Sequence, residues 1–213
     1  MSRIIIFANG HLPDREKARA IIRADDTLIA ADGGTRHMLT LGLKPDLIIG
    51  DLDSITEEER RKMESDGVKI AKYSRDKNET DLELAIQHAL EVGPGQIVII
   101  AALGGRLDQT LANLALISDI RFAQLDVRLD DGVEEAFFCR DQVQVQGRSG
   151  DVVSLIPWQG AVAGVRTENL KWPLQNEKLY PEKTRGVSNE MTGDTASIEI
   201  KSGLLLVVHR RNS

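Results

Sequence analysis

Short, continuously apolar runs alternate with amphipathic segments over roughly the first 120 residues of this chain. Runs of this kind are typical of strands in a mostly parallel sheet that is covered on both faces. Five such strands are predicted, at residues 3–8, 27–31, 46–49, 68–73 and 96–102. The pattern therefore predicts an α/β N-terminal domain, a mostly parallel sheet flanked by helices.

Helix starts can be read between these strands. Thr56 with Glu59, and Thr80 with Glu83, have the spacing of a capping box, in which Thr caps the helix and Glu lies three residues further on. A third helix is predicted from Asp108 to about Ser118, with its leucines directed inward. These three helices fit the connections that a parallel sheet needs.

The pattern changes from about Val127, where helix signals end and short β-type runs separated by turn residues begin. These runs are residues 135–139, 143–146, 151–156, 196–200 and 204–209. Their apolar and polar positions partly alternate, as in half-buried antiparallel strands. We therefore expect an all-β C-terminal sandwich domain. The expected division is 1–128 and 129–213, with the boundary between residues 124 and 134.

Composition narrows the class of protein. The 213 residues carry a formal net charge of −6 and no dense Lys/Arg block, which argues against a nucleic-acid partner. No apolar stretch approaches the roughly 20 residues that span a bilayer, and the N-terminus lacks the features of a signal peptide. The lone cysteine, Cys139, excludes an internal disulfide and fits a buried thiol. A cytoplasmic protein with no membrane partner is expected.

Acidic or glycine-rich segments follow four of the predicted strands. Ligands of open α/β sheets bind at the carboxyl ends of the strands, so these segments are expected to meet. They are Asp32-Gly33-Gly34, Gly50-Asp51-Leu52-Asp53-Ser54, the acidic segment 76–81, and Gly104-Gly105-Arg106-Leu107-Asp108-Gln109. Carboxylate oxygens suit Mg²⁺, which is commonly held by one or two carboxylates and substrate phosphates.

Each candidate also has a structural interpretation. Asp51 and Asp53 could cap the following helix, but Thr56 already supplies that cap. Asp32 could form a turn, and Asp81 could serve the dipole of its helix. Lys77 and Arg106 are candidate phosphate-binding cations that could instead pair with neighbouring acids. The four histidines share no metal-ligand spacing and receive no role.

These motifs occur together in an order that closely resembles the thiamine pyrophosphokinase (thiamine diphosphokinase) family. The resemblance continues in the second half of the chain and covers nearly all of it. Its carriers there are Ser154-Leu155-Ile156-Pro157, Leu170-Lys171-Trp172-Pro173-Leu174 and Gly186-Val187-Ser188-Asn189-Glu190.

The resemblance implies an enzyme that transfers a diphosphate group from ATP to the hydroxyl of thiamine, giving thiamine diphosphate and AMP. It implies Mg²⁺ as cofactor, ATP as co-substrate, and a homodimer with thiamine at the subunit interface. By the same resemblance, Asp51, Asp53 and Asp81 are the catalytic, metal-holding residues. The resemblance implies that ATP and its phosphates are bound by Asp32, Lys77, Thr80, Arg106, Asp108 and Gln109. It implies that thiamine is bound by Trp172, Ser188 and Asn189.

One position departs from the family. Bacterial members often have Asp where this chain has Asn78, so an ionic role for Asn78 is not expected. The residues also leave alternatives open. Asp81 or Asp51 could accept the alcohol proton. The acceptor could be another alcohol such as a hydroxymethyl pterin, or the chain could sense nucleotide or thiamine without catalysis.

Overall fold

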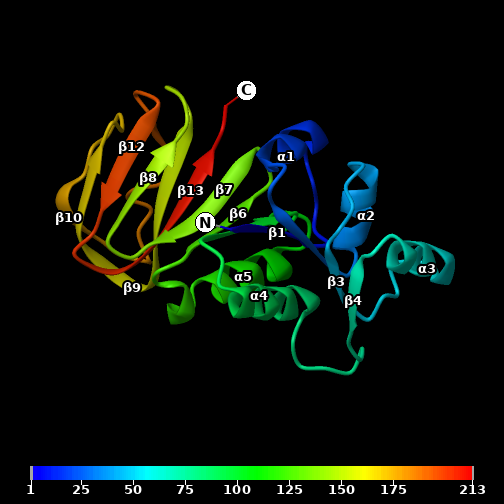
Figure 1. Cartoon of the computed structure of the whole chain (residues 1–213). Helices are drawn as coiled ribbons and strands as arrows, with labels where there is room; N and C mark the ends of the chain where they lie inside the picture. Colours follow the sequence, from blue (N-terminus) through cyan, green and yellow to red (C-terminus); the bar gives the residue numbers. More distant parts are fainter. Residues whose placement is uncertain (1, 213) are drawn as a thin grey trace. The chain divides into compact units, whose positions relative to one another are not determined.

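The computed structural model describes residues 2–212, and the chain divides into two compact units, residues 1–132 and 133–213. Figure 1 colours both units along the sequence. Each unit is described by itself below.

The first unit is built on a parallel sheet with the strand order β4-β3-β2-β1-β5-β6. Its strands are β1 (Arg3–Phe7), β2 (Thr27–Ala31), β3 (Leu47–Gly50), β4 (Lys69–Lys72), β5 (Gln96–Ile100) and β6 (Asp126–Asp130). Almost every residue of β1, β2, β3 and β5 is buried, because helices cover the sheet from both sides. The predicted α/β class is therefore confirmed.

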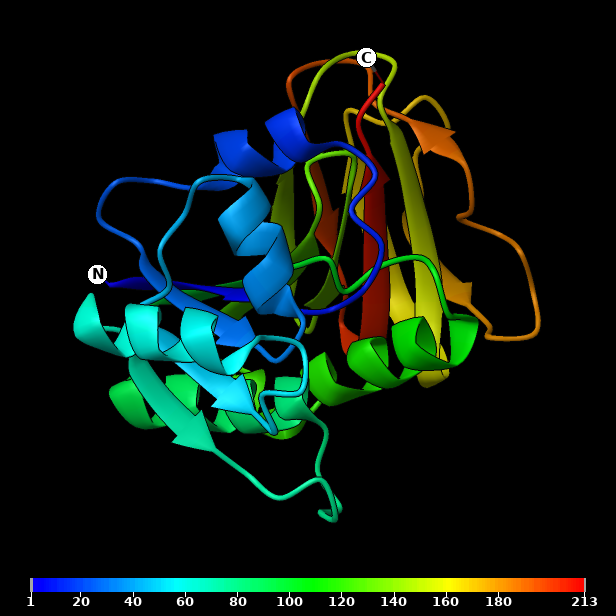
Figure 2. The ribbon, with the colours of Figure 1, turned by 90° about the vertical axis from the view of Figure 1, so that its right-hand side faces the viewer.

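The helices of the first unit lie on both faces of this sheet. In both ribbon views α1 and α2 lie on one face, and α4 and α5 lie on the other (Figures 1 and 2). The bounds are α1 (Arg15–Ile21), α2 (Gly34–Thr40), α3 (Glu57–Ser65), α4 (Asp81–Val92), α5 (Leu107–Ile117) and a short 3₁₀ helix, η1 (Ile120–Phe122). The capping box at Thr56 is present in full, and Thr80 caps α4 by accepting from Glu83 N.

The second unit is an antiparallel β domain. Its strands are β7 (Glu134–Cys139), β8 (Gln142–Gln146), β9 (Val152–Glu168), β10 (Gln175–Leu179), β11 (Asn189–Glu190), β12 (Thr195–Glu199) and β13 (Ser202–Arg210). The first half of β9 pairs with β13 and β11, and its second half pairs with β10 and β12. Two sheets that share β9 therefore enclose an apolar core that includes Phe137, Leu155, Val165 and Ile198.

Candidate active site

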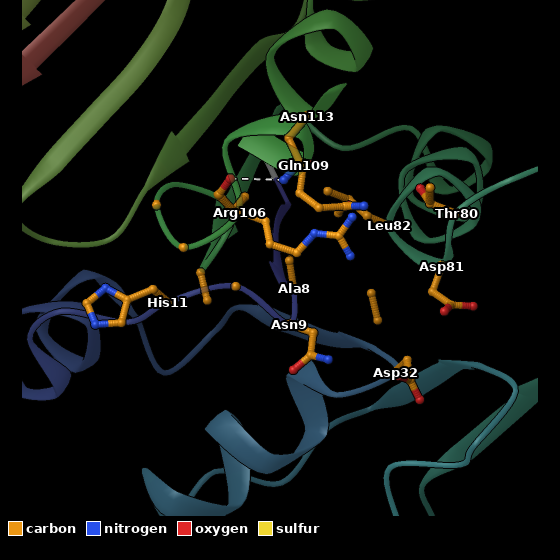
Figure 3. A pocket seen from close by; sticks show the side chains of 16 residues that line it. Ala8, Asn9, His11, Asp32, Thr80, Asp81, Leu82, Arg106, Gln109 and Asn113 are labelled. Carbon is orange, nitrogen blue, oxygen red and sulfur yellow. Dashed lines mark hydrogen bonds between the residues drawn. The ribbon is translucent and has the colours of Figure 1, made fainter. Parts of the chain in front are cut away.

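The order of the parallel strands reverses at β1, which lies between β2 on one side and β5 on the other. Such a switch point leaves a crevice at the carboxyl ends of the strands. A pocket of about 430 Å³ lies there in the first unit, shown from close by in Figure 3. It is lined by Ala8, Asn9, Gly10, His11, Ala31, Asp32, Thr80, Asp81, Leu82, Ala101, Ala102, Gly104, Gly105, Arg106, Gln109 and Asn113.

Three aspartates gather where β2 and β3 end. Among residues 2–212, Asp32, Asp51 and Asp53 form a group in which one carboxylate oxygen from each residue lies within 4.8 Å of the other two. The Asp32 backbone N–H donates to Ile49 O over 2.8 Å, which fixes the end of β2 against β3. Asp53 N donates to Asp51 Oδ1 over 3.1 Å. The two loops thus bring the three carboxylates together.

The backbone around this site adopts unusual conformations at non-glycine residues. Asp32, Leu52 and Ala101 have φ angles of +42°, +69° and +57°, in the left-handed region that L-residues seldom occupy. Each follows the carboxyl end of a different strand, β2, β3 or β5. Strained backbone of this kind is concentrated at functional sites, where the surrounding packing enforces it.

Asp81 begins α4 on the opposite side of the pocket from the β1 loop. Its Oδ1 atom is buried and lies 3.0 Å from Lys77 Nζ, as an ion pair without the geometry of a hydrogen bond. In Figure 3 Asp81 and Asp32 lie on the same side of the pocket. Like Asp81 Oδ1, Asp32 Oδ1 is buried and has no hydrogen-bond partner within the described part of the chain.

The local electrostatics favour a cation. Burial raises the pKa of Asp32 above its usual value of 3.8; interactions with Ser54 and Gly33 N oppose the shift, and the charges of Asp81 and Asp53 add to it. Negative charge is thus concentrated where two buried carboxylate oxygens have no donor. Oxygen atoms alone make up this donor set, which suits a hard divalent cation.

The glycine-rich segment after β5 supplies the other wall. Arg106 and Gln109 line the pocket, and in Figure 3 the Arg106 side chain extends into its middle. Arg106 forms an ion pair with Asp108, with Nε donating to Oδ1 over 3.1 Å, and this hydrogen-bonded pairing lowers the pKa of Asp108. The buried Asn113 donates to Ala102 O over 2.9 Å and so holds the start of this segment.

A second pocket, of about 410 Å³, lies in the β domain and includes Trp172 and Asn189 in its lining. Trp172 is 49% exposed although it is a large apolar side chain. Asn189 is buried, and its amide clasps the Trp172 backbone: Nδ2 donates to Trp172 O over 2.7 Å, and Oδ1 accepts from Trp172 N over 3.0 Å. Lys171 Nζ lies 4.7 Å from the centre of the indole ring.

The structure brings some of the predicted site residues together and leaves others at the margins. Asp32, Thr80, Asp81, Arg106 and Gln109 line the first pocket. Asp51 and Asp53 join Asp32 in the acidic group, whereas Lys77 reaches the site through its ion pair with Asp81. Asp108 and Ser188 are not among the residues that line either pocket.

Sequence reasoning passed over the segment that follows β1. Asn9, Gly10 and His11 line the first pocket, as does Asn113 from α5. The rule that ligands bind at strand ends applies to β1 as well, so it could have identified Asn9 and its neighbours. Asn113 lies two turns into its helix, where no such signal exists.

An open parallel sheet with a pocket at its switch point, here followed by an antiparallel β domain, defines an α/β protein that binds a ligand at its strand ends. Residues 18–129 match the family model described as thiamin pyrophosphokinase, catalytic domain. Residues 141–205 match the model described as thiamin pyrophosphokinase, vitamin B1 binding domain. The chain belongs to the thiamin pyrophosphokinase family. It is therefore an enzyme of a family that uses ATP.

Individual relatives agree with this assignment. A thiamine pyrophosphokinase of Bacillus subtilis is 30% identical over 182 residues, which are 84% of this chain and 85% of the relative. Thiamine pyrophosphokinase 1 of Oryza sativa is 27% identical over 79% of this chain and 67% of its own length. Both domains of the family are thus present in this chain.

Solved structures give the same result. The crystal structure of the Bacillus subtilis enzyme superposes with a TM-score of 0.88 at 26% identity over the full length of both chains. A thiamin pyrophosphokinase family protein of Enterococcus faecalis superposes with a TM-score of 0.83 at 27% identity, again over both full chains. Within residues 2–212, no helix has the length and apolar character that crossing a membrane requires.

Proposed function

We propose that this enzyme is an Mg²⁺-dependent ATP:thiamine diphosphotransferase, with Asp32, Asp51, Asp53 and Asp81 forming its metal and phosphate centre. The observation that carries the proposal is the acidic group at the ends of β2 and β3, beside the pocket of a thiamin pyrophosphokinase catalytic domain. The vitamin B1 binding domain that follows supports thiamine as the acceptor.

The residues present fit a magnesium ion. Two buried carboxylate oxygens, on Asp32 and Asp81, have no hydrogen-bond donor within residues 2–212, and the Asp32 carboxylate belongs to the group with Asp51 and Asp53. We assign the metal to Asp51, Asp53 and Asp81, with Asp32 beside them. When bound, Mg²⁺ would neutralise phosphate charge and orient the phosphates for in-line attack.

The phosphates of ATP are assigned to the cations and helix starts around the pocket. The first turns of α4 and α5 begin at the pocket, where Thr80, Asp81, Arg106 and Gln109 line it, and the start of a helix attracts phosphate. Arg106 offers a planar guanidinium that suits phosphate oxygens once it exchanges Asp108 for the ligand. Lys77 and Asp108 are the remaining residues of the assigned set. Lys77 pairs with Asp81, and Asp108 pairs with Arg106.

The reaction is an attack by the hydroxyl oxygen of thiamine on the β-phosphorus of ATP. The bond breaks between the β-phosphorus and the oxygen that bridges it to the α-phosphorus, and AMP leaves with that oxygen. A carboxylate accepts the hydroxyl proton. Asp81 and Asp51 both remain candidates for that carboxylate. Catalysis relies mainly on positioning and charge neutralisation, because the reaction needs no covalent intermediate with the protein.

Thiamine is assigned to the second pocket. Its cationic thiazolium suits the exposed face of an aromatic ring, and Trp172 presents such a ring. Asn189 fixes the backbone from which Trp172 projects, and Ser188 precedes it on the same segment. Lys171 lies over the Trp172 ring and pairs with Glu190 Oε2 at 2.7 Å, so bound thiamine would share the ring with this cation or displace it.

We further propose that the enzyme works as a homodimer, with thiamine held between the catalytic domain of one subunit and the β domain of the other. Leu107 and Leu111 are 72% and 50% exposed on one face of α5, directly beside Arg106. An exposed apolar pair at the margin of an active site supports burial against a second copy.

Mixed dimers test this arrangement. Asp81→Ala and Trp172→Ala subunits, each inactive alone, are co-expressed. If each site takes residues from two subunits, random pairing restores about a quarter of the wild-type activity, because half of the dimers carry one intact site of two. Absence of any restored activity in isolated mixed dimers would reject the shared site.

Product analysis tests the reaction itself. Incubation with ATP, Mg²⁺ and thiamine should yield AMP and thiamine diphosphate in equal amounts. ADP as the sole nucleotide product would reject diphosphate transfer. Turnover of a hydroxymethyl pterin in place of thiamine would move the enzyme to another acceptor.

We also propose a cytoplasmic location. Cys139 is the single cysteine of the sequence, so the chain has no internal disulfide, which is consistent with a reducing compartment. Fractionation of cells that express a tagged copy, with detection in the cytoplasmic fraction, is the corresponding measurement.

A further inference from the structure

His37 makes a contact that the proposed reaction does not use. It lies on α2, where its half-buried ring places Nε2 at 2.9 Å from the backbone oxygen of Gly10. Gly10 belongs to the segment after β1 that lines the nucleotide pocket. A side chain outside the pocket lining therefore holds the backbone of the pocket wall.

The Gly10 peptide is held on two sides. Its N–H donates to Ala101 O over 2.8 Å, at the end of β5, and its oxygen meets His37. A Cβ atom at Gly10 would stand 2.4 Å from Ala101 O, so this segment packs on the neighbouring strand with no room for a side chain. His37 therefore fixes the one polar atom of Gly10 that the sheet leaves free.

The held segment abuts the glycine-rich turn. A Cβ atom at Gly105 would stand 3.7 Å from His11 N and His11 Cβ, and both segments line the pocket. A shift of Gly10 would consequently change the spacing between the β1 segment and the Gly104–Gly105 turn. Because both segments line the pocket, such a change would alter the shape of its lining.

The chemistry of the contact identifies the donor. A carbonyl oxygen only accepts, so Nε2 must carry the hydrogen. Both the neutral tautomer with hydrogen on Nε2 and the protonated ring satisfy this, so the contact does not depend on the charge of the ring. A glutamine amide can offer an N–H group from the same backbone position, whereas leucine offers none.

We propose that His37 is a positioning residue for ATP: it holds Gly10 in place and thereby keeps the β1 segment at the spacing that the nucleotide requires. The proposal rests on the proposed function only in naming ATP as the ligand. It goes beyond that function because His37 belongs to none of the motifs that carry it.

The experiment compares His37→Leu, His37→Gln and a matched control, His88→Leu. His88 is a half-buried histidine on α4 in the same unit. Affinity is measured by calorimetry with α,β-methylene ATP and Mg²⁺, and KM and kcat are measured for both substrates. His37→Leu should weaken the affinity for the analogue and raise the KM for ATP about 3- to 10-fold, the worth of one hydrogen bond.

A positioning role predicts a specific pattern among these values. The KM for thiamine and kcat should change less than about 2-fold, and His37→Gln should bind the analogue nearly as tightly as wild type, as should His88→Leu. Unchanged affinity in a folded His37→Leu variant would overturn the proposal. Equal weakening in His37→Gln and His37→Leu would also overturn it, because the restored donor would then have no effect.

Hydrogen exchange separates this proposal from the proposed function. In the ligand-free protein, the Gly10 amide should exchange faster in His37→Leu than in wild type and His37→Gln. Should wild type fail to bind the ATP analogue, the proposed function fails while this measurement still tests the restraint on Gly10. Unchanged Gly10 exchange in His37→Leu would reject that restraint. If His37→Leu does not fold, His37→Gln is compared with His37→Asn, whose side chain is shorter. The proposal then predicts weaker binding of the analogue and faster Gly10 exchange in His37→Asn only.

Discussion

Burial raises the pKa of Asp32 and the charge of Asp81 adds to the shift, although the two residues lie 49 positions apart in the chain. Gly50 lies between them: a Cβ atom there would stand 3.0 Å from Asp32 Cβ and 3.3 Å from Asp81 Oδ1. Each aspartate keeps a buried oxygen without a hydrogen-bond donor among residues 2–212. Asp32 and Asp81 therefore place like charge close together, with Lys77 paired to Asp81, and a bound cation would neutralise more of that charge.

Replacing Asp32 by Asn should stabilise the metal-free protein and impair the enzyme. Because the pKa of this carboxyl is raised in the folded state, its ionised form opposes folding, and that cost appears as the pH rises through the raised pKa. At pH 7 we expect Asp32→Asn to increase the free energy of unfolding by about 1 kcal/mol and to lower activity strongly. Urea titration in EDTA measures the first effect and AMP formation the second.

The exposed Asp25 provides a matched control. Asp25→Asn should leave both stability in EDTA and activity unchanged. If Asp32→Asn destabilises the metal-free protein, the negative charge of Asp32 is not the unfavourable feature inferred here.

Gly50 should tolerate no side chain. A methyl group at this position would contact Asp32 Cβ at 3.0 Å and push Asp81 or Asp32 away from the acidic group. We expect Gly50→Ala to lower the affinity for Mn²⁺, a spectroscopic substitute for Mg²⁺, at least about 10-fold, or 1.4 kcal/mol. Electron paramagnetic resonance titration of the nucleotide-free protein provides the measurement.

Gly67→Ala, at a turn with no atom within 4 Å of the added carbon, is the control. Equal Mn²⁺ affinity in Gly50→Ala and wild type would contradict the assignment of this position to the metal centre.

Asp81→Ala should abolish turnover while the fold is retained. Asp81 lies at the first position of α4, where its charge favours the helix, but it also faces Asp32. These two effects oppose each other, so we expect a stability change within about 1 kcal/mol and a loss of kcat of at least about 1,000-fold. Asp76→Ala, an exposed carboxylate of the same loop, should keep its activity. Substantial turnover by Asp81→Ala would remove this residue from the mechanism.

The apolar pattern predicted the parallel sheet because its strands are buried on both faces and are therefore continuously apolar. The same reasoning fails for β6 (Asp126–Asp130), which reads Asp-Val-Arg-Leu-Asp and resembles an antiparallel strand, although it pairs in parallel with β5. β9 was recognised only in its first part. Gly160 and Gly164 interrupt its pattern, because the strand passes from one sheet to the other near these residues.

The candidate site was predictable as a set of strand ends but not as a geometry. Acidic residues after consecutive strands indicate one edge of a sheet, whatever the strand order. The group of Asp32 with Asp51 and Asp53 depends on β2 lying beside β3, and the pocket depends on β5 lying beside β1. Strand order is a property of the whole fold, so no local pattern contains it.

Asn189 should act on thiamine through Trp172. Its amide holds the Trp172 backbone through both its nitrogen and its oxygen, so loss of the amide should first displace the Trp172 ring. We expect Asn189→Leu to raise the KM for thiamine about 10-fold or more and to leave the KM for ATP unchanged. In a double-mutant cycle of thiamine affinities, measured by calorimetry so that inactive variants can be included, Asn189→Leu should add little to Trp172→Ala, because both act on one contact. Fully additive effects would show that Asn189 acts independently of Trp172.

His209 should be among the most sensitive positions for stability. Its fully buried ring lies between two carboxylates, with Nδ1 at 2.9 Å from Glu135 Oε1 and Nε2 at 3.1 Å from Asp151 Oδ2. The two carboxylates therefore hold the ring from both sides. His209→Leu would leave two buried carboxylates facing an apolar side chain. We expect a loss of about 3–5 kcal/mol in the free energy of unfolding, measured by urea titration at pH 7.

The loss of stability at low pH should depend on the cluster of His209, Glu135 and Asp151. Burial alone would raise the pKa of Asp151, but hydrogen bonds from Asn212 N, His209 and Arg148 N outweigh it and hold the pKa below 3.8. A carboxyl whose folded-state pKa is depressed stabilises the fold above its unfolded pKa, and that contribution disappears as the pH falls through the folded value. Wild type should therefore lose stability as the pH falls from about 5 towards 2. Asp151→Asn, starting from lower stability at pH 7, should lose less across the same range. Parallel curves for the two proteins would show that Asp151 has no part in the acid sensitivity.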